Sequence, residues 1–458
     1  MAYKTVNPFT GEVITSFAEI HQQALDGKLQ KAAACFETWR NKSFDDRKKV
    51  VQKIAYLMRE RSGELAALIT LEMGKRIKES KGEVELSASI YEYYTTHAER
   101  FLADEQLAPG KGAAYTSKEP IGALLGIEPW NYPYYRVARF AAPNIMAGNC
   151  VVPKHASNVP QRALAIQKLF DDVGAPEGLH SNLFISSEKI NDLLADPIIK
   201  SVSLTASEGA GASAAVAAGK NLKKSVLELG GSDPFIILED AELDKTVKWA
   251  VSGRMQNCGQ ACTAAKRFMV MNTLYEKFLK KFKATLGQLK SGDPMLETTT
   301  LGPLSSKSAL EGLEDQVEKS IKAGAKVVTG GKRFKMEGYF MQPAILTDVP
   351  KNAVAYTEEL FGQAASVYRV NSEDAAVELA NATRFGLGGA IFAKDESRGH
   401  QLAKRINSGT LFINHTSSQP DLPFGGTNQS GYGRELSSPG IDEFLNKKLV
   451  RTSNINDK

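Results

Sequence analysis

The segment 257–262, NCGQAC, combines two cysteines with residues that favour a bend. A Gly-Gln bend before Cys262 lets the backbone present its sulfur to a cavity. The reactive form of cysteine is the thiolate, which requires a lowered pKa or a nearby base. Cys262 is therefore a candidate nucleophile, and a small buried apolar side chain is the alternative interpretation. Cys258 and Cys262 lack the second Cys/His pair of a metal site, so no metal is expected.

Glu228 is a candidate for acid–base chemistry. It lies at the end of an apolar run, shortly before Gly230 and Gly231. A charged residue in such a place is costly unless it is paired or functional. Burial raises the pKa of a carboxyl group toward neutrality and suits it to activate a water molecule. A salt-bridged structural glutamate remains the alternative.

The segment PWNYP is followed by YYRVARF, and together they predict a helix. Asn131 is a suitable N-cap, and Pro133 fits the first turn. Four side chains at helical spacing share one face, namely Tyr132, Tyr135, Arg136 and Arg139. Such a face could receive an anionic substrate. A solvated surface is the alternative, because most arginines are exposed.

No Gly-x-Gly-x-x-Gly fingerprint for a dinucleotide follows a predicted strand. The segment LTASEGAG does follow a strand, and a helix of small residues after it could hold a diphosphate at its N-terminus. Another predicted strand ends in PKHAS, with Lys154 and Ser157 but no carboxylate. A ribose bound there could carry a 2′-phosphate without repulsion. A surface lysine is the alternative for Lys154.

These segments lie between alternating predicted strands and helices. Strands are expected near 123–127, 150–153, 198–204 and 225–229. A second series contains FIILED, RFMVMN, AKVVTGG, GGAIFAK and TLFINH. The alternation predicts mostly parallel sheets in two α/β domains. Helices are expected over 25–41, 44–62, 64–73 and 75–102, the third ending at Gly74. The segment after Leu107 predicts a protruding hairpin. The C-terminal tail has strand character, and we expect it to contact either this hairpin or another subunit.

The composition is typical of a soluble globular protein. Of 458 residues, 42% are hydrophobic and 24% are charged, which excludes a disordered or fibrous chain. The net charge of +5 is spread along the sequence, so neither nucleic acid nor a membrane is an expected partner. No apolar run is long enough to cross a bilayer, and the start lacks an apolar signal region. Four cysteines in such a long chain fit reduced thiols, and we expect a cytoplasmic protein.

Taken in order, seven motifs resemble the aldehyde dehydrogenase superfamily from about Asn7 to Leu449: PWNYP, VPKHAS, LTASEGAG, LELGGSDP, NCGQAC, EELFG and PFGGTNQSGYGRE. The resemblance implies an α/β fold with a Rossmann-type cofactor domain, an α/β catalytic domain and a small bridging β-sheet. It places the cofactor domain at 1–105 with 123–228 and the catalytic domain at 229–424. The bridging segments are then 106–122 and 436–458, in a homodimer or homotetramer.

The resemblance also implies residue roles. Cys262 is the expected nucleophile, which forms a thiohemiacetal and then a thioester. Asn131 and the backbone amide of Cys262 are expected to hold the oxyanion. Glu228 is expected to activate the water that hydrolyses the thioester. The implied cofactor-binding residues are Trp130, Lys154, Ser157, Ser207, Glu359 and Phe361.

Within the superfamily, PKHAS and SVLELGGSDP are most similar to bacterial succinate-semialdehyde dehydrogenases. In that group an arginine at the position of Arg139 pairs with the substrate carboxylate, and a serine near Ser418 assists. Arg136 either reinforces this contact or only lines the tunnel. Ser157 beside Lys154 favours NADP, with NAD second, since members that prefer NAD often carry glutamate there.

Two alternatives for the function stay open. One is oxidation of another aldehyde, such as glutarate semialdehyde or an aliphatic aldehyde. The other is a cofactor-independent thiol hydrolase or a silent binding scaffold. An enzyme that transfers the acyl group to CoA is disfavoured, because Glu228 supplies the water-activating base that such enzymes lack.

Overall fold

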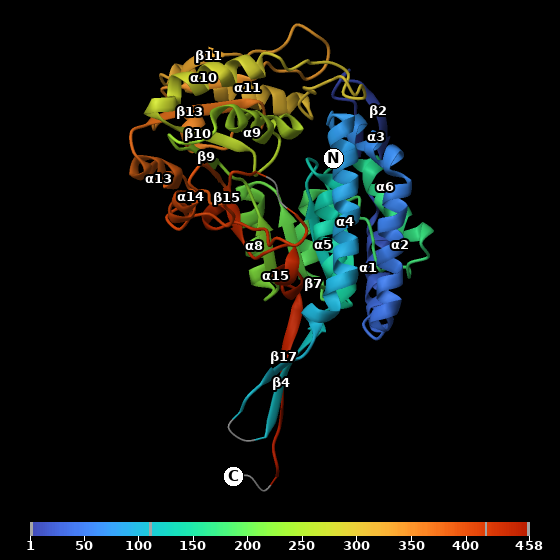
Figure 1. Cartoon of the computed structure of the whole chain (residues 1–458). Coiled ribbons are helices and arrows are strands. Elements are labelled where there is room, and N and C mark those ends of the chain that lie inside the picture. The colour runs from blue at the N-terminus through green and yellow to red at the C-terminus, as the bar shows by residue number, and fades with distance from the viewer. Residues whose placement is uncertain (1–2, 110–111, 417–418, 456–458) are drawn as a thin grey trace.

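The computed structural model describes residues 3–109, 112–416 and 419–455. Within these ranges the strands form four sheets, and the two largest make up the body of the molecule (Figure 1). Each of these two sheets is largely parallel. The predicted α/β fold is confirmed, whereas the domain boundaries drawn from the sequence stay a prediction.

The five-stranded sheet has the order β16-β8-β7-β5-β6. Neighbouring strands within this sheet are parallel, except that β16 pairs antiparallel with β8. Every residue of β5 and β6 is buried, as expected of parallel strands covered on both faces. The strands are β5 (Ala123–Glu128), β6 (Cys150–His155), β7 (Ile199–Thr205), β8 (Lys224–Glu228) and β16 (Gly431–Tyr432). The helices between them are α5 (Pro133–Ala147), α6 (Pro160–Asp172), α7 (Ile190–Ala195) and α8 (Glu208–Lys220).

The seven-stranded sheet has the order β11-β12-β13-β10-β9-β14-β15. Its strands are β9 (Asp233–Ile237), β10 (Ala265–Met271), β11 (Lys326–Thr329), β12 (Ala344–Thr347), β13 (Ala364–Val370), β14 (Ala390–Phe392) and β15 (Phe412–Ile413). Its helices are α9 (Leu243–Met255), α10 (Asn272–Leu286), α11 (Lys307–Lys322), α12 (Val354–Thr357), α13 (Glu373–Asn381) and α14 (Glu396–Ala403). The sequence analysis did not predict β12 or β13. The first is only four residues long, and the second opens with Ala-Ala-Ser, which has little strand preference.

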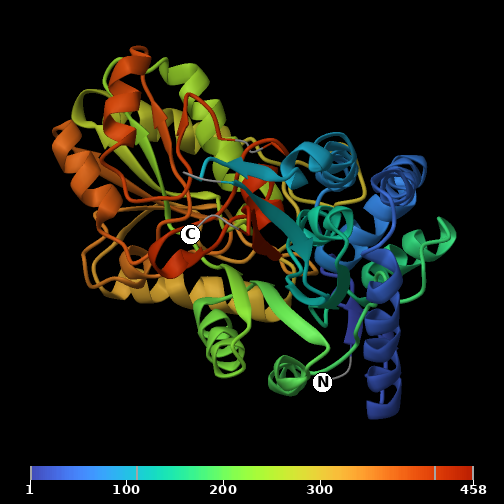
Figure 2. The same ribbon diagram turned by 90° about the horizontal axis from the view of Figure 1, so that it is seen from below.

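Four long helices precede the first sheet, where the sequence predicts them: α1 (Gln22–Trp39), α2 (Phe44–Glu60), α3 (Ser62–Met73) and α4 (Ile77–Leu102). Gly74 ends α3 with a φ of 70°, as the C-cap prediction requires. Ahead of them, β1 (Tyr3–Val6) pairs antiparallel with β2 (Val13–Phe17). Seen from below, these helices (blue) and the seven-stranded half (yellow to orange) lie on opposite sides of the molecule (Figure 2). Among the described residues, no helix is long and apolar enough to cross a membrane.

Helix α5 is buried along its whole length, including Arg136 and Arg139. The interpretation of its arginine face as a solvated surface is therefore wrong. The prediction that Asn131 caps this helix is also wrong, because the N-cap is Tyr132. Glu83 of α4 replaces an Asn cap, since its Oε1 accepts from the backbone amide of Tyr134 at 2.9 Å. Asn131 is thereby free to act elsewhere.

A three-stranded arm extends from the body (Figure 1). It consists of β3 (Glu105–Leu107), β4 (Ala113–Pro120) and β17 (Leu445–Thr452). Strand β17 pairs antiparallel with the full length of β4. The predicted contact between the C-terminal tail and the hairpin is confirmed. Helix α15 (Ser437–Asp442) leads the chain from the body into β17.

A buried ion pair fixes the start of α5. Lys75 and Glu83 are each 1% exposed and form an ion pair between their side chains. Lys75 also donates to the backbone oxygen of Asn131 at 2.8 Å, and its ammonium lies 3.8 Å from the ring centroid of Tyr132. Burial lowers the pKa of Lys75, and Glu83 opposes that shift. The pair joins α4 to the first residues of the PWNYP segment.

We expect Glu83→Ala to lower the free energy of unfolding by about 3–5 kcal/mol, because it leaves the Lys75 charge buried without a partner. Urea unfolding of the two proteins measures the difference. Glu85→Ala is the matched control on the same helix. It removes an exposed ion pair with Arg59 and should cost less than about 1 kcal/mol. Equal losses in the two variants would contradict the assigned role of the pair.

Candidate active site

The loop that carries Cys262 has an unusual backbone. After α9 ends, Asn257, Cys258 and Gly259 have φ angles of 50°, 54° and 74°. Only glycine adopts this left-handed region without cost, so the loop stores strain. A Cβ on Gly259 would lie 2.2 Å from the carbonyl oxygen of Gly362, which requires glycine there. Cys258 turns away, and its Sγ contacts the carbonyl oxygen of Gly302 at 3.2 Å.

Cys262 is 8% exposed and lines a cavity of about 180 Å³. The same cavity is lined by the four residues predicted to share one helix face, Tyr132, Tyr135, Arg136 and Arg139. Phe424 and Thr416 approach from the C-terminal part of the chain. The structure therefore brings the candidate nucleophile and the arginine face to one enclosed space. Ser418 lies outside the described residues.

The two arginines of this cavity have different partners. Arg139 forms an ion pair with Glu435, and its guanidinium carbon lies 3.9 Å from the ring centroid of Phe424. Arg136 donates from Nη2 to the Sγ of Cys262 at 3.0 Å. The sequence analysis gave Glu435 no role, although it lies within the motif PFGGTNQSGYGRE.

Glu228 ends β8 and is 1% exposed. Neither carboxylate oxygen has a hydrogen-bond partner within the described chain. Burial raises its pKa to about 8, and the negative charge of Glu435 acts in the same direction. A Cβ on Gly425 would lie 2.9 Å from Oε1, so the absence of a side chain there leaves room for the carboxyl group. Such a carboxyl group can exchange a proton near neutral pH.

Asn131 is buried beside the cysteine loop. Its Nδ2 donates to the carbonyl oxygen of Gln260 at 3.0 Å. Its own backbone oxygen accepts from Lys75 and, at 3.0 Å, from Nδ2 of Asn257. The side-chain amide is therefore held next to the nucleophile loop, where an amide N–H can receive a developing oxyanion.

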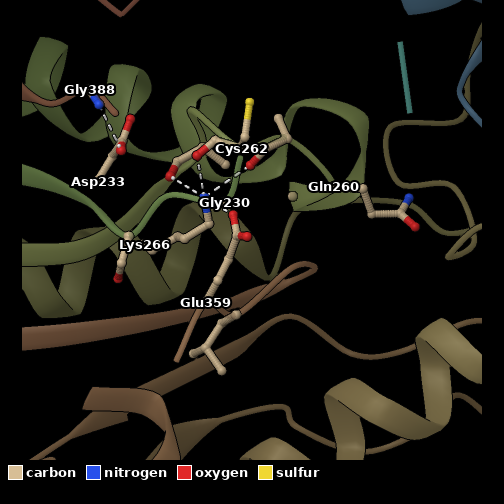
Figure 3. Close-up of polar contacts among 12 residues, drawn as sticks. Gly230, Asp233, Gln260, Cys262, Lys266, Glu359 and Gly388 are labelled. Carbon is tan, nitrogen blue, oxygen red and sulfur yellow. Dashed lines mark hydrogen bonds and ion pairs between the residues drawn. The ribbon is translucent and has the colours of Figure 1, made fainter. Parts of the chain in front are cut away.

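Lys266, which the sequence analysis did not identify, supports this loop from below. Its Nζ donates to the carbonyl oxygens of Cys262 at 2.7 Å and Ala261 at 3.0 Å. It also forms an ion pair of 2.9 Å with Glu359. Figure 3 shows the sulfur of Cys262 pointing away from this ammonium group. Burial raises the pKa of Glu359, and Lys266 opposes that shift.

Arg254 ties the same two loops together and was likewise not predicted. It is fully buried at the end of α9. Its Nη2 donates to the carbonyl oxygen of Gly259 at 2.7 Å and also contacts that of Gly362. The loop before Cys262 and the loop with Glu359 therefore share one guanidinium.

Four of the residues expected to bind a cofactor lie at or just after the carboxyl ends of three parallel strands. Trp130 follows β5, Lys154 is near the end of β6 with Ser157 two residues beyond it, and Ser207 is the N-cap of α8 after β7. The carboxyl ends of parallel strands meet at one edge, which is where dinucleotides bind in such sheets. Phe361 contacts Trp130, with ring centroids 5.8 Å apart.

The donor set at this edge fits a phosphorylated dinucleotide. Ser207 is exposed at the N-terminus of a helix 13 residues long, a favourable place for a diphosphate. A Cβ on Gly211 would lie 2.6 Å from Leu229, so this glycine permits the close helix–strand packing typical of such sites. Lys154 is largely buried, and burial lowers its pKa.

Residues 1–450 match one protein family, "Aldehyde dehydrogenase family". The chain belongs to the aldehyde dehydrogenase family. It is 50% identical over 450 residues to the Deinococcus radiodurans protein named succinate-semialdehyde dehydrogenase [NADP(+)], covering 98% of this chain and 94% of that protein. It is 44% identical to a Synechocystis protein named probable succinate-semialdehyde dehydrogenase [NADP(+)], covering 98% and 99% of the two chains.

Solved aldehyde dehydrogenase structures agree with this fold. The crystal structure of succinic semialdehyde dehydrogenase from Streptococcus pyogenes in complex with NADP+ has a TM-score of 0.97 with this chain. The two sequences are 40% identical, and the match covers 99% of this chain and 100% of the other. In this aldehyde dehydrogenase, the cavity of Cys262 is lined by residues of both α/β halves.

We expect Lys266→Met to lower the free energy of unfolding by about 3 kcal/mol, because the buried Glu359 carboxylate loses its counter-ion. The double variant Lys266→Met/Glu359→Gln should lose less than the single one, since no charge is left unpaired. Urea unfolding measures the free energy of unfolding of both variants. Lys280→Met, at an exposed position on α10, is the control, and its free energy of unfolding should stay within about 0.5 kcal/mol of the parent value. A double variant whose loss equals the sum of the two single losses would show that the residues are not coupled.

Proposed function

We propose that this aldehyde dehydrogenase oxidises succinate semialdehyde to succinate, with NADP as the preferred acceptor and NAD as the second. The observation that carries the proposal is the presence of Arg136 and Arg139 in the cavity of Cys262. A carboxylated aldehyde can bind the Nε and Nη1 donors of these guanidinium groups, which have no hydrogen-bond partner within the described chain, whereas an uncharged aldehyde leaves them unsatisfied. The names of the Deinococcus and Synechocystis relatives support the same substrate.

In the proposed reaction, the Cys262 thiolate attacks the aldehyde carbon, and a carbon–sulfur bond forms while the carbonyl electron pair moves to oxygen. The side-chain amide of Asn131 and the backbone amide of Cys262 donate to this oxyanion. NADP, when bound, supplies the acceptor for the hydride that leaves the same carbon. Loss of the hydride leaves a thioester on Cys262.

Glu228 carries the second half of the proposed reaction. Its carboxylate takes a proton from a water molecule whose oxygen attacks the thioester carbon. The carbon–sulfur bond then breaks, succinate leaves and the thiolate is restored. Because no described residue holds the carboxylate of Glu228, its oxygens are available for water.

The cofactor preference rests on Lys154 and Ser157. The end of β6 offers an ammonium group and a hydroxyl group but no carboxylate that would repel a 2′-phosphate. Trp130, Ser207, Glu359 and Phe361 complete the proposed cofactor site. The relatives whose names include NADP support this preference.

The same proposal extends to organisation and location. The three-stranded arm supports a homodimer or homotetramer, since the outer edges of β17 and β3 have no strand partner within the described chain. The proposed domains are 1–105 with 123–228 for the cofactor and 229–424 for catalysis. The bridging segments are 106–122 and 436–458, and the proposed location is the cytoplasm.

Initial rates of cofactor reduction test the substrate. With NADP, we expect the kcat/KM for succinate semialdehyde to be about 10²-fold or more above that for butanal, because only the charged aldehyde pairs with the arginines. The kcat/KM measured with NADP should also exceed that measured with NAD. Arg139→Ala should raise the KM for succinate semialdehyde far more than that for butanal.

The matched control for these rates is Cys262→Ala, which should bind NADP but oxidise neither aldehyde. Equal rates for both aldehydes would discard the semialdehyde assignment, and a glutarate semialdehyde preference would select the longer substrate. Absence of reduction with either cofactor would favour the hydrolase or the silent scaffold.

The pH dependence tests Glu228. With a pKa of about 8, its carboxyl group is protonated at pH 7 and becomes a base as the pH rises through 8. Steady-state turnover limited by thioester hydrolysis should therefore increase over this range. Glu228→Gln should keep a single burst of reduced cofactor but lose most later turnover. Glu128→Gln is the control, because Glu128 is also buried with a pKa raised by burial to about 8. Full turnover in Glu228→Gln would remove this residue from the mechanism.

A further inference from the structure

Arg136 and Arg139 lie one helical turn apart, and both reach Glu435, but at different distances. Arg139 is in close contact with Glu435, whereas Nη1 of Arg136 stays 4.0 Å from its Oε2, at the limit of an ion pair. The hydrogen bond of Arg136 within the described chain runs from Nη2 to Sγ of Cys262, at 3.0 Å. Its Nε and Nη1 are buried without a hydrogen-bond partner there.

The surroundings require a negative partner for this guanidinium. Arg136 is 3% exposed and Cys262 is 8% exposed, so water screens neither group well. Burial lowers the pKa of Arg136, but the negative charges of Cys262 and Glu435 outweigh burial and raise it above its usual value. A thiolate opposite Arg136 satisfies this need, whereas a neutral thiol does not.

We propose that Arg136 is the counter-ion of the Cys262 thiolate and that its remaining donors bind the carboxylate of the substrate. A guanidinium plane has two edges, each with two parallel N–H groups, and Nη2 contributes one hydrogen to each edge. The sulfur occupies one hydrogen of Nη2, which leaves the other edge complete. One rigid group therefore holds the nucleophile on one side and a carboxylate on the other.

This arrangement has a consequence for substrate length. Sulfur and carboxylate bound to adjacent edges of one plane are close together, so the aldehyde carbon and the carboxylate must be separated by few bonds. A four-carbon semialdehyde meets this condition better than a longer one. The substrate half of the inference rests on the proposed function, whereas the contact with Cys262 does not.

Other charged or titratable groups surround Cys262 and, apart from Arg139 in one control, are common to every variant considered below. They are Tyr132 at the N-cap of α5, Tyr135 on α5, Glu228 at the end of β8, Asp233 on β9, Lys266 on β10, and the pair of Arg139 with Glu435. Lys266 binds the backbone side of Cys262, away from the sulfur (Figure 3). Arg136 is the cation in contact with Sγ.

Alkylation of Cys262 in the substrate-free protein tests the contact. Iodoacetamide rates are measured from pH 5.5 to 9.5, with Cys262 identified by peptide mass. Arg136→Gln should move the midpoint of this profile to higher pH, because the thiolate loses its counter-ion. At pH 6 its rate should be about threefold or more below the parent rate, and above the midpoint the less stabilised thiolate should react at least as fast. A general loss of structure would lower the rate at all pH values or expose the sulfur at all of them.

Two further variants make the comparison specific. Arg136→Lys keeps the charge and should restore most of the pH profile. Arg139→Lys, which keeps the ion pair with Glu435, should match the parent protein. Identical profiles for Arg136→Gln and the parent, with similar melting temperatures, would overturn the proposal. If the Gln variant does not fold, Arg136→Met removes the same charge with a side chain of similar length.

The parent protein offers a test that needs no variant. Iodoacetate carries a carboxylate next to its reactive carbon, so the free edge of Arg136 should make it alkylate Cys262 about tenfold faster than iodoacetamide at pH 7. A ratio of one or less would overturn the proposal. Neither reagent depends on the natural aldehyde or on NADP, so a failed substrate assignment and a failed role for Arg136 give different results.

Discussion

The buried pair of Lys75 and Glu83 is the constraint on which the geometry of the site depends. Two opposite charges without access to water must stay together, because separating them leaves each charge buried without a partner, which strongly destabilises the folded state. Glu83 also accepts hydrogen bonds from the first free backbone amides of α5, and Lys75 donates one to the backbone oxygen of Asn131. The start of α5 is therefore fixed in both position and direction. Arg136 and Arg139 of α5 therefore line the cavity of Cys262.

Two buried cations tie loops of the seven-stranded half together by binding backbone oxygens. Lys266 and Arg254 each contact the cysteine loop and the loop of Glu359. Backbone carbonyl groups cannot be changed by substitution, so these contacts tolerate sequence variation in the loops themselves. They also hold three consecutive left-handed residues in place, a strained arrangement that the loop could not keep alone. Cys262 is thus positioned by folding, before any ligand arrives.

Local sequence pattern was enough to predict the backbone setting of residues that lie at the end of a strand, at the start of a helix or after a bend. Cys262 follows a bend-forming segment, Glu228 ends an apolar strand, and Ser207 begins a helix after a strand. Glu435, Lys266 and Arg254 were not found, because their partners lie elsewhere in the chain. The N-cap of α5 was predicted wrongly for the same reason: an acceptor from α4 replaced the local one. The fold class followed from the alternation of strands and helices, whereas strand β13 was hidden by its small residues.

The arm has a consequence for how this chain is made. Strand β4 leaves the ribosome early, but its partner β17 is among the last segments to be synthesised. Until then β4 is paired only with the short strand β3 on one side. Its other edge, where β17 will bind, exposes unpaired backbone groups. The five-stranded sheet also gains β16 late in synthesis. A ribosome-bound chain therefore carries an open sheet edge through most of translation, which is the interval in which it is most vulnerable to misassembly with other nascent chains.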